Sequence, residues 1–165
     1  SVYAAAGRAA SVDSVDRNAP ALDTTERNMA ANRHLTGVDG VPHRTIEGDA
    51  FAVMTELDRL GLRYDLVVVD PPSFASRADQ VDAALRAYER LTRLAADLID
   101  DGGMLVQSSC SSRVTEDVFH DHVLSALRDT GRRVDEWART GHAVDHPVGF
   151  PEGRYLKTTF ARLDA

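Results

Sequence analysis

Three carboxylates and one thiol stand at the ends of predicted strands in this sequence. Asp16, Asp49 and Asp70 each follow an extended segment rich in β-branched residues, and Cys110 follows a fourth such segment. A carboxylate at the end of a parallel strand is the usual acceptor for the ribose hydroxyls of a nucleoside cofactor. Cys110 is the single cysteine, so it forms no internal disulfide and its thiol is free for chemistry.

The segment Asp70-Pro71-Pro72-Ser73-Phe74 is the centre of this pattern. It follows the continuous apolar run 64–69, which predicts a strand buried on both faces, as in a parallel sheet. Pro71 favours an extended Asp70, and neither proline can donate to a strand ladder. Asp70 is therefore expected at the carboxyl end of a central strand, where α/β sheets bind ligands. The alternative is that Asp-Pro-Pro only ends the strand in a turn.

The remaining elements follow from apolar periodicity, caps and turn residues. Helices are predicted at about 1–6, 18–32, 49–61, 78–99 and 115–131, and strands at about 10–16, 44–47, 104–109, 132–139 and 154–162. Residues 101–103 predict a tight turn before the fourth strand. The alternation of helix and strand predicts a single α/β domain over 1–165, with a parallel sheet and a final antiparallel hairpin.

Composition excludes several classes of protein. The chain has 165 residues, 43% of them hydrophobic and 27% charged, which is ordinary for a soluble globular domain. We find neither a signal peptide nor an apolar run long enough to span a membrane, and the lone cysteine favours a cytoplasmic protein. The net charge of -7 excludes a surface that coats nucleic acid as a whole, so phosphate binding would need a local basic patch.

Each candidate residue also has a purely structural interpretation. Asp16 could be an exposed turn residue, Asp49 a helix N-cap, and Cys110 a small core residue. His142 and His146 are four residues apart, but Gly141 and Pro147 beside them favour a loop, so we expect no metal site.

Taken together, these motifs resemble the class I S-adenosylmethionine-dependent methyltransferases, and most closely the bacterial large-subunit ribosomal RNA cytosine-C5 methyltransferase family. Asp-Pro-Pro alone is shared with many amino-group methyltransferases, whereas the set in this order is more specific. The matching segments are Ser1–Ala5, Val12–Asp16, Asp70–Phe74, Ser109–Ser111, Asp145–Pro147 and Pro151–Lys157.

The resemblance implies a Rossmann-like fold, S-adenosylmethionine as cofactor and ribosomal RNA as substrate. It implies that Cys110 adds to carbon 6 of the cytosine ring and that Asp70 binds and activates the base. The cofactor would contact Asp16, Asp49, Ala50, Asp70 and Pro71, and the substrate would contact Pro72, Phe74, Arg154 and Lys157. Phe74 could instead anchor its loop, and Arg154 and Lys157 could be ordinary charges on a strand surface.

The sequence departs from the family in one respect. In the family a strand and a Gly-rich turn come directly before the residues that match Ser1, and RNA-binding domains come before these. We therefore expect a chain truncated at its N-terminus, which lacks the strand between those that end in Asp16 and Asp70. The expected consequences are a defective cofactor pocket and an exposed or distorted sheet edge.

Other functions stay open. A methyltransferase that acts on an amino or ring nitrogen would use Asp-Pro-Pro without a cysteine adduct. A nicotinamide-dependent oxidoreductase also places acids at strand ends, although no Gly-rich fingerprint is present. A fragment that binds RNA or a partner without catalysis is the third possibility. The oligomeric state and the target nucleotide do not follow from the sequence.

Overall fold

The computed structural model describes residues 1–150 and 153–165. Pro151 and Glu152, which begin the predicted motif that ends at Lys157, lie outside the described residues. The chain divides into two compact units, Ser1–Glu56 and Leu57–Ala165. The expectation that 1–165 is one domain stays a prediction.

The first unit contains a two-stranded parallel sheet and its helices. In chain order these are α1 (Val2–Ala6), β1 (Val12–Asp16), α2 (Ala19–Ala31), β2 (His43–Glu47) and the first part of α3 (Ala50–Arg59). Asn18 stands at the N-cap of α2 and Pro20 in its first turn, where its missing N–H costs no helical hydrogen bond. Ala5, Met29 and Val38 form a small apolar core. The helices and strands of this unit were predicted to within three residues at either end.

The second unit is built on a four-stranded sheet of order β3-β4-β6-β5. Its elements are β3 (Tyr64–Val69), the short 3-10 helix η1 (Ala78–Gln80), α4 (Val81–Leu98), β4 (Ile99–Ser109), α5 (Glu116–Arg128), β5 (Arg133–Thr140) and β6 (Lys157–Asp164). β3 and β4 are parallel, whereas β6 is antiparallel to both β4 and β5. The predicted parallel pair and the final antiparallel hairpin are therefore confirmed.

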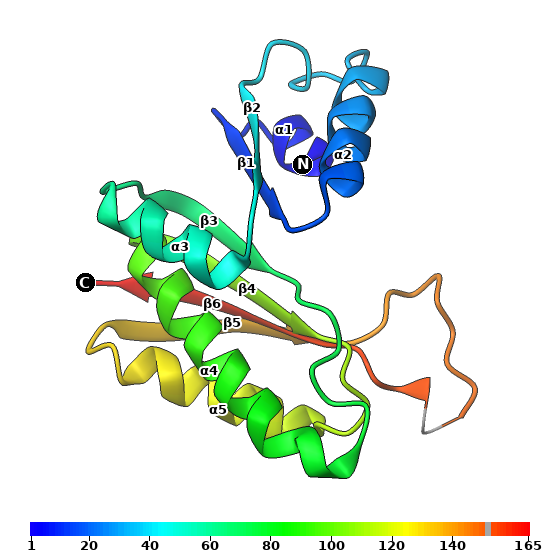
Figure 1. Ribbon diagram of the computed structural model, residues 1–165, viewed down its shortest axis with the longest axis vertical. Coiled ribbons are helices and arrows are strands. Elements are labelled where there is room, and N and C mark those ends of the chain that lie inside the picture. The colour runs from blue at the N-terminus through cyan, green and yellow to red at the C-terminus, as the bar shows by residue number, and fades with distance from the viewer. Residues whose placement is uncertain (151–152) are drawn as a thin grey trace. The chain divides into compact units, whose positions relative to one another are not determined.

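Helices α4 and α5 cover one face of this sheet (Figure 1). α4 packs on β3 and β4, α5 packs on β5 and β6, and the two helices contact each other. The two helices bury Tyr88, Leu91, Phe119 and Val123 among others, and β4 and β6 bury residues such as Leu105 and Ala161. This layer of apolar side chains is the core of the second unit.

The expectation that β3 is buried on both faces is wrong. Val69 is buried, but the side chains of Leu66 and Val68 are 46% and 61% exposed. Among the described residues, β3 is hydrogen-bonded to β4 on one side and to no strand on the other, so it is an edge strand of this sheet. An exposed sheet edge was expected from the resemblance, but the absence of a particular strand there stays a prediction.

The predicted turn at 101–103 is also corrected. β4 already begins at Ile99 and continues through this segment, with an irregular register opposite Tyr64 and Leu66. Gly102 has φ +77, a left-handed conformation that a residue with a side chain adopts only with strain. The glycines thus permit a bulge inside a longer strand.

Among residues 1–150 and 153–165, no helix is long and apolar enough to cross a membrane.

Candidate active site

The loops after β3 and β4 carry the two side chains for which we predict catalytic roles. Val69 pairs with Gln107 in the parallel ladder, so Asp70 and the segment around Cys110 both leave the sheet at the same carboxyl edge. Asp70 is exposed and, among the described residues, makes no hydrogen bond or ion pair. Its carboxylate therefore remains available for an external ligand.

One serine ties these two loops together. The Ser111 hydroxyl accepts hydrogen bonds from the backbone N–H groups of Phe74 at 3.1 Å and Ala75 at 3.3 Å. It also lies 3.2 Å from the hydroxyl of Ser73. Since Ser111 is fully buried, water does not compete for these bonds. The Asp-Pro-Pro-Ser-Phe loop is thereby fixed beside the loop of Cys110.

Tyr88 of α4 contacts both of these loops. Its buried hydroxyl lies 2.8 Å from the hydroxyls of both Ser109 and Ser111. Its ring contacts the ring of Phe74, with centroids 5.1 Å apart. Phe74 is thus anchored in its loop by Tyr88, in agreement with the structural role that the sequence left open, and base stacking by Phe74 stays a prediction.

Cys110 lies between Ser109 and Ser111, the two serines that bind Tyr88. Its thiol is free and the residue is only partly buried. The serines on either side are fully buried and hydrogen-bonded, which fixes the backbone on both sides of the cysteine. If Cys110 were only a small core residue, it would be fully buried. Its partial exposure is compatible with a role as nucleophile.

Lys157 does not lie on the surface. Its side chain is 3% exposed, and its Nζ atom donates to the carbonyl oxygens of Ser111 and Val114, both at 2.6 Å, and of Tyr155 at 3.2 Å. The predictions that Lys157 contacts substrate phosphate or is an ordinary strand-surface charge are therefore wrong. Its ammonium group is directed at the loop that follows Cys110 and is not accessible to a phosphate group.

The other predicted substrate contacts are accessible. Pro72 is exposed and Pro71 half-buried in the loop after β3. Arg154 is exposed and, within the described part of the chain, has no hydrogen bond or ion pair. Their predicted contacts with cofactor and substrate stay predictions.

The first unit brings two of the predicted cofactor residues to one edge. Asp16 and Glu47 pair at the carboxyl ends of β1 and β2, and the N–H of Gly48 donates to the Asp16 carbonyl at 3.0 Å. Asp49 follows at once. Both carboxylates thus stand at the carboxyl edge of this two-stranded sheet, as predicted.

Asp49 also caps the helix that follows. One oxygen of its carboxylate accepts the N–H groups of Phe51 and Ala52, at 3.1 and 3.3 Å, and the other pairs with Arg17. Desolvation acts to raise the pKa of Asp49, but the Ala52 N–H and Arg17 together hold it below its usual value. The N-cap interpretation is therefore correct, and it leaves little of this carboxylate free.

Asp16 is less engaged. It is exposed, and one of its oxygens accepts the N–H of Asn18 at 2.8 Å, which closes a turn. Among the described residues, its second oxygen has no hydrogen-bond or ion-pair partner. Ala50, the first residue of α3, has a backbone N–H with no intrahelical acceptor. A free carboxylate oxygen and a free backbone donor fit a nucleoside with a ribose diol.

Sequence reasoning missed Tyr88 and Ser111, which hold the two loops together. Tyr88 was placed in the apolar stripe of the long helix, and its buried position agrees with that. The signal that could have identified it was a hydroxyl within an apolar stripe, because a buried hydroxyl needs a partner. The serine-rich segment 108–112 supplies that partner.

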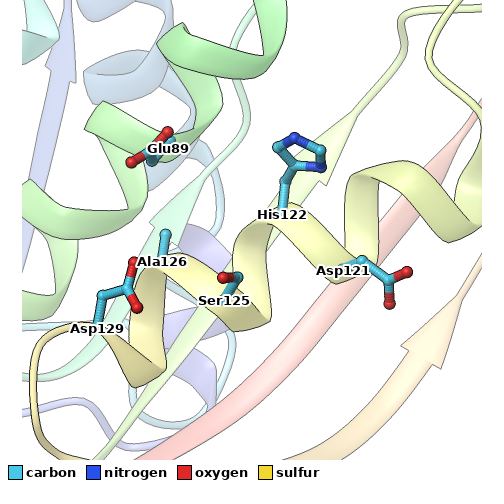
Figure 2. A pocket seen from close by; sticks show the side chains of 6 residues that line it. All are labelled: Glu89, Asp121, His122, Ser125, Ala126 and Asp129. Atoms are coloured by element: carbon cyan, nitrogen blue, oxygen red, sulfur yellow. The ribbon is translucent and has the colours of Figure 1, made fainter.

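A separate hollow lies between α4 and α5, with a volume of about 410 Å³ (Figure 2). Its lining residues are Glu89, Asp121, His122, Ser125, Ala126 and Asp129. Arg93 bridges Glu89 and Asp129 at 3.0 and 2.9 Å, so part of the acidic charge is neutralised. None of the lining residues belongs to the loops after β3 and β4.

Within 1–150 and 153–165, no group of three or more His, Cys, Asp or Glu side chains could hold a metal ion.

Comparison with known proteins identifies similar sequences and similar structures. The chain is 40% identical over 164 residues to a ribosomal RNA large subunit methyltransferase from Deinococcus radiodurans, covering 99% of this chain and 39% of the relative. It is 38% identical to ribosomal RNA large subunit methyltransferase I from Shewanella amazonensis, with coverage of 98% and 40%. The chain thus spans about two-fifths of the length of these curated relatives. It matches no protein-family model.

Solved structures give the fold. An S-adenosylmethionine-dependent methyltransferase from Streptococcus mutans superimposes with a TM-score of 0.79 at 21% identity, covering 98% of this chain and 40% of that chain. A methyltransferase crystallised with S-adenosylhomocysteine gives 0.78 at 22% identity, with coverage of 98% and 41%. The fold is therefore the Rossmann-like α/β fold of S-adenosylmethionine-dependent methyltransferases.

Proposed function

We propose that this chain forms the catalytic part of an S-adenosylmethionine-dependent methyltransferase that methylates carbon 5 of a cytosine in ribosomal RNA. The observation that carries the proposal is the tie through Ser111, which joins the loop of Asp70 to the loop of the only thiol. The relatives from Deinococcus and Shewanella, named as ribosomal RNA methyltransferases, support the substrate class.

The cofactor would contact the first unit through polar groups with unused hydrogen-bonding capacity. The free oxygen of Asp16 would accept the ribose hydroxyls, and the N–H of Ala50 would donate to the adenine ring. Asp49 would act mainly by fixing the start of α3, because Arg17 and two backbone N–H groups occupy its carboxylate. When bound, the cofactor supplies a methyl group on a positively charged sulfur.

Cys110 would supply the nucleophile that cytosine needs. Carbon 5 of the ring is too weakly nucleophilic to take a methyl group unaided. The thiolate adds to carbon 6, which makes carbon 5 electron-rich, and carbon 5 then takes the methyl group. A base removes the proton from carbon 5, and the bond between sulfur and carbon 6 breaks to release the thiolate. The partial exposure of Cys110 is consistent with access by a base.

Asp70 would bind the polar edge of the same base. Its carboxylate has no partner in the described chain, so it can accept a hydrogen bond from the protonated ring nitrogen or the amino group. Pro71 and Pro72 limit the backbone freedom of this loop. Arg154, exposed and unpaired among the described residues, would contact phosphate, and the base would be flipped out of the folded RNA.

The experiment uses a chimera in which these 165 residues replace the matching part of the Deinococcus relative. It is incubated with S-adenosylmethionine and ribosomal RNA that contains 5-fluorocytosine, whose fluorine blocks the final proton removal. We expect a cofactor-dependent covalent adduct, detected as a slower band in a denaturing gel, and no adduct with Cys110→Ala.

Ordinary ribosomal RNA provides the control. If Cys110→Ala still transfers methyl groups to it and no adduct forms with the unmodified chimera, the enzyme acts on an amino or ring nitrogen, and the cytosine-C5 proposal is rejected. If the chimera neither forms an adduct nor transfers methyl groups, while the intact Deinococcus relative does, the proposed activity is rejected for this chain.

A further inference from the structure

Lys157 is the only lysine in the sequence, and its burial is unusual for a charged side chain. β6 begins at Lys157, which pairs with Ser109 across the antiparallel ladder. From there its Nζ atom donates to the carbonyl oxygens of Ser111 and Val114. The lysine thus holds the segment directly after the cysteine.

The hydrogen bonds indicate that this lysine is charged. An ammonium group has three N–H donors, and three carbonyl oxygens surround Nζ. A neutral amine has only two donors and would leave one carbonyl without a bond. Among the described residues, no carboxylate is in hydrogen-bond contact with Nζ. The positive charge is therefore stabilised by dipoles and is not neutralised by an ion pair.

Burial lowers the pKa of Lys157, whereas attraction to the ionised Cys110 thiol and to Glu116 raises it. These are the two titratable groups whose charge acts on Lys157. Glu116, at the start of α5, has a side chain that is 64% exposed, so water screens its charge. Cys110 is the less exposed of the two and lies in the segment that Lys157 binds.

We propose that Lys157 is a positioning residue that stabilises the thiolate form of Cys110 and holds the loop that presents it. This inference rests on the proposed role of Cys110 as nucleophile. The carbonyl of Ser111, the residue directly after Cys110, accepts a hydrogen bond from the buried ammonium group, so a positive charge is held next to the segment that carries the thiol. A thiolate is the reactive form of cysteine, so the lysine increases the fraction that can attack.

The first test measures alkylation of Cys110 by iodoacetamide between pH 5 and pH 10, in the 165-residue chain. Because the chain has one cysteine, the increase in protein mass reports this residue alone. In Lys157→Met we expect the midpoint of the pH–rate curve to move upward, so that the rate at pH 7 falls about three- to tenfold while the rate at pH 10 is unchanged. Circular dichroism verifies that the variant is folded.

Ser111→Ala is the matched control. It removes the hydroxyl that ties the loops but keeps the backbone carbonyl that Lys157 binds. This variant loosens the packing of the loops but keeps the charge of Lys157, so we expect the midpoint of its pH–rate curve to stay unchanged. An equal shift in Ser111→Ala, or no shift in a folded Lys157→Met, would overturn the proposal.

A second test needs no substitution of the lysine, in case Lys157→Met does not fold. Protein labelled with 13C-lysine gives a single ε-CH2 signal in the NMR spectrum, because Lys157 is the only lysine. We expect this signal to move at the midpoint found for alkylation, and to lose this step in Cys110→Ser. Identical curves for the two proteins would overturn the proposal.

Neither test depends on methyl transfer. The proposal for Lys157 can therefore fail while the adduct of Cys110 with 5-fluorocytosine still forms. Conversely, a shifted alkylation midpoint without any adduct would leave the electrostatic effect in place and reject the catalytic role of the thiol.

Discussion

The Ser111 hydroxyl accepts the backbone N–H of Phe74 at 3.1 Å, across 37 residues of sequence. The two residues belong to loops that follow neighbouring parallel strands. Side chains at the carboxyl edge of a sheet are held only by such contacts, because the strand ladders end below them. The buried hydroxyl of Ser111, with its partner Tyr88, therefore helps to fix the loop of Asp70 relative to the loop of Cys110.

Ser111→Ala is expected to lower the free energy of unfolding of the second unit by about 1–3 kcal/mol, because buried polar groups lose their partner. Urea unfolding followed by the fluorescence of Trp137, the only tryptophan, measures this. Ser112→Ala is the matched control, since Ser112 is exposed, and it should change the value by less than about 0.5 kcal/mol. Equal effects of the two substitutions would show that the hydroxyl of Ser111 is not a structural tie.

The fold was largely predictable from local pattern. The α-helices and strands of the described residues follow from apolar periodicity, caps and glycines, and these signals are local in sequence. The exposure of Leu66 and Val68 was not predictable, because it depends on which layer covers each face of the sheet. An apolar run favours a strand with two covered faces, but one face of this strand is open in the described structure.

The sequence predicted which residues stand at the candidate site, but not all of the hydrogen bonds that they make there. Asp16, Asp49, Asp70 and Cys110 stand at strand ends, as alternation of helix and strand requires. Lys157 was expected either to contact substrate phosphate or to lie on a strand surface, because lysine is rarely buried. Its three carbonyl partners belong to the segment after β4 and to the residues just before β6. These segments are far apart in the sequence, so no local pattern predicts the contact.

Arg132 is expected to stabilise the second unit through the end of α4. Its guanidinium donates to the carbonyl oxygens of Ala96 and Ile99, at 3.0 and 2.7 Å, where α4 ends and β4 begins. Arg132→Met should lower the free energy of unfolding by about 1–3 kcal/mol in urea. The neighbouring Arg133 pairs with Asp164 on the surface, so Arg133→Met should lower it by less than about 1 kcal/mol. The reverse order of the two effects would contradict this assignment.

His120 should make stability depend on pH near neutrality. Burial lowers its pKa, the charge of Arg139 lowers it further, and Glu116 and Glu136 oppose this shift. Because the unfolded chain then binds the proton more tightly, the free energy of unfolding should fall as pH drops below about 6.5, until the folded pKa is reached. Urea unfolding at pH 7.5, 6.5 and 5.5 measures this.

The fully buried His120 has its Nδ1 atom 2.6 Å from Thr159, whereas His122 is on the outer part of the same helix. His120→Gln should reduce the pH dependence between 7.5 and 5.5, and His122→Gln should leave it unchanged. If His120→Gln retained the full slope, other groups would be its source.

Asp70→Asn should abolish methyl transfer without loss of stability. Asp70 is exposed and makes no hydrogen bond or ion pair within the described chain, so the free energy of unfolding should change by less than about 0.5 kcal/mol. The amide cannot stabilise a protonated ring as a carboxylate does, so the rate in the chimera should fall about 100- to 1000-fold. Asp65→Asn, at an exposed position on β3, the strand that precedes Asp70, should retain full activity. A rate that survives Asp70→Asn would mean that another group activates the base, and the thiol of Cys110 would then act without this carboxylate.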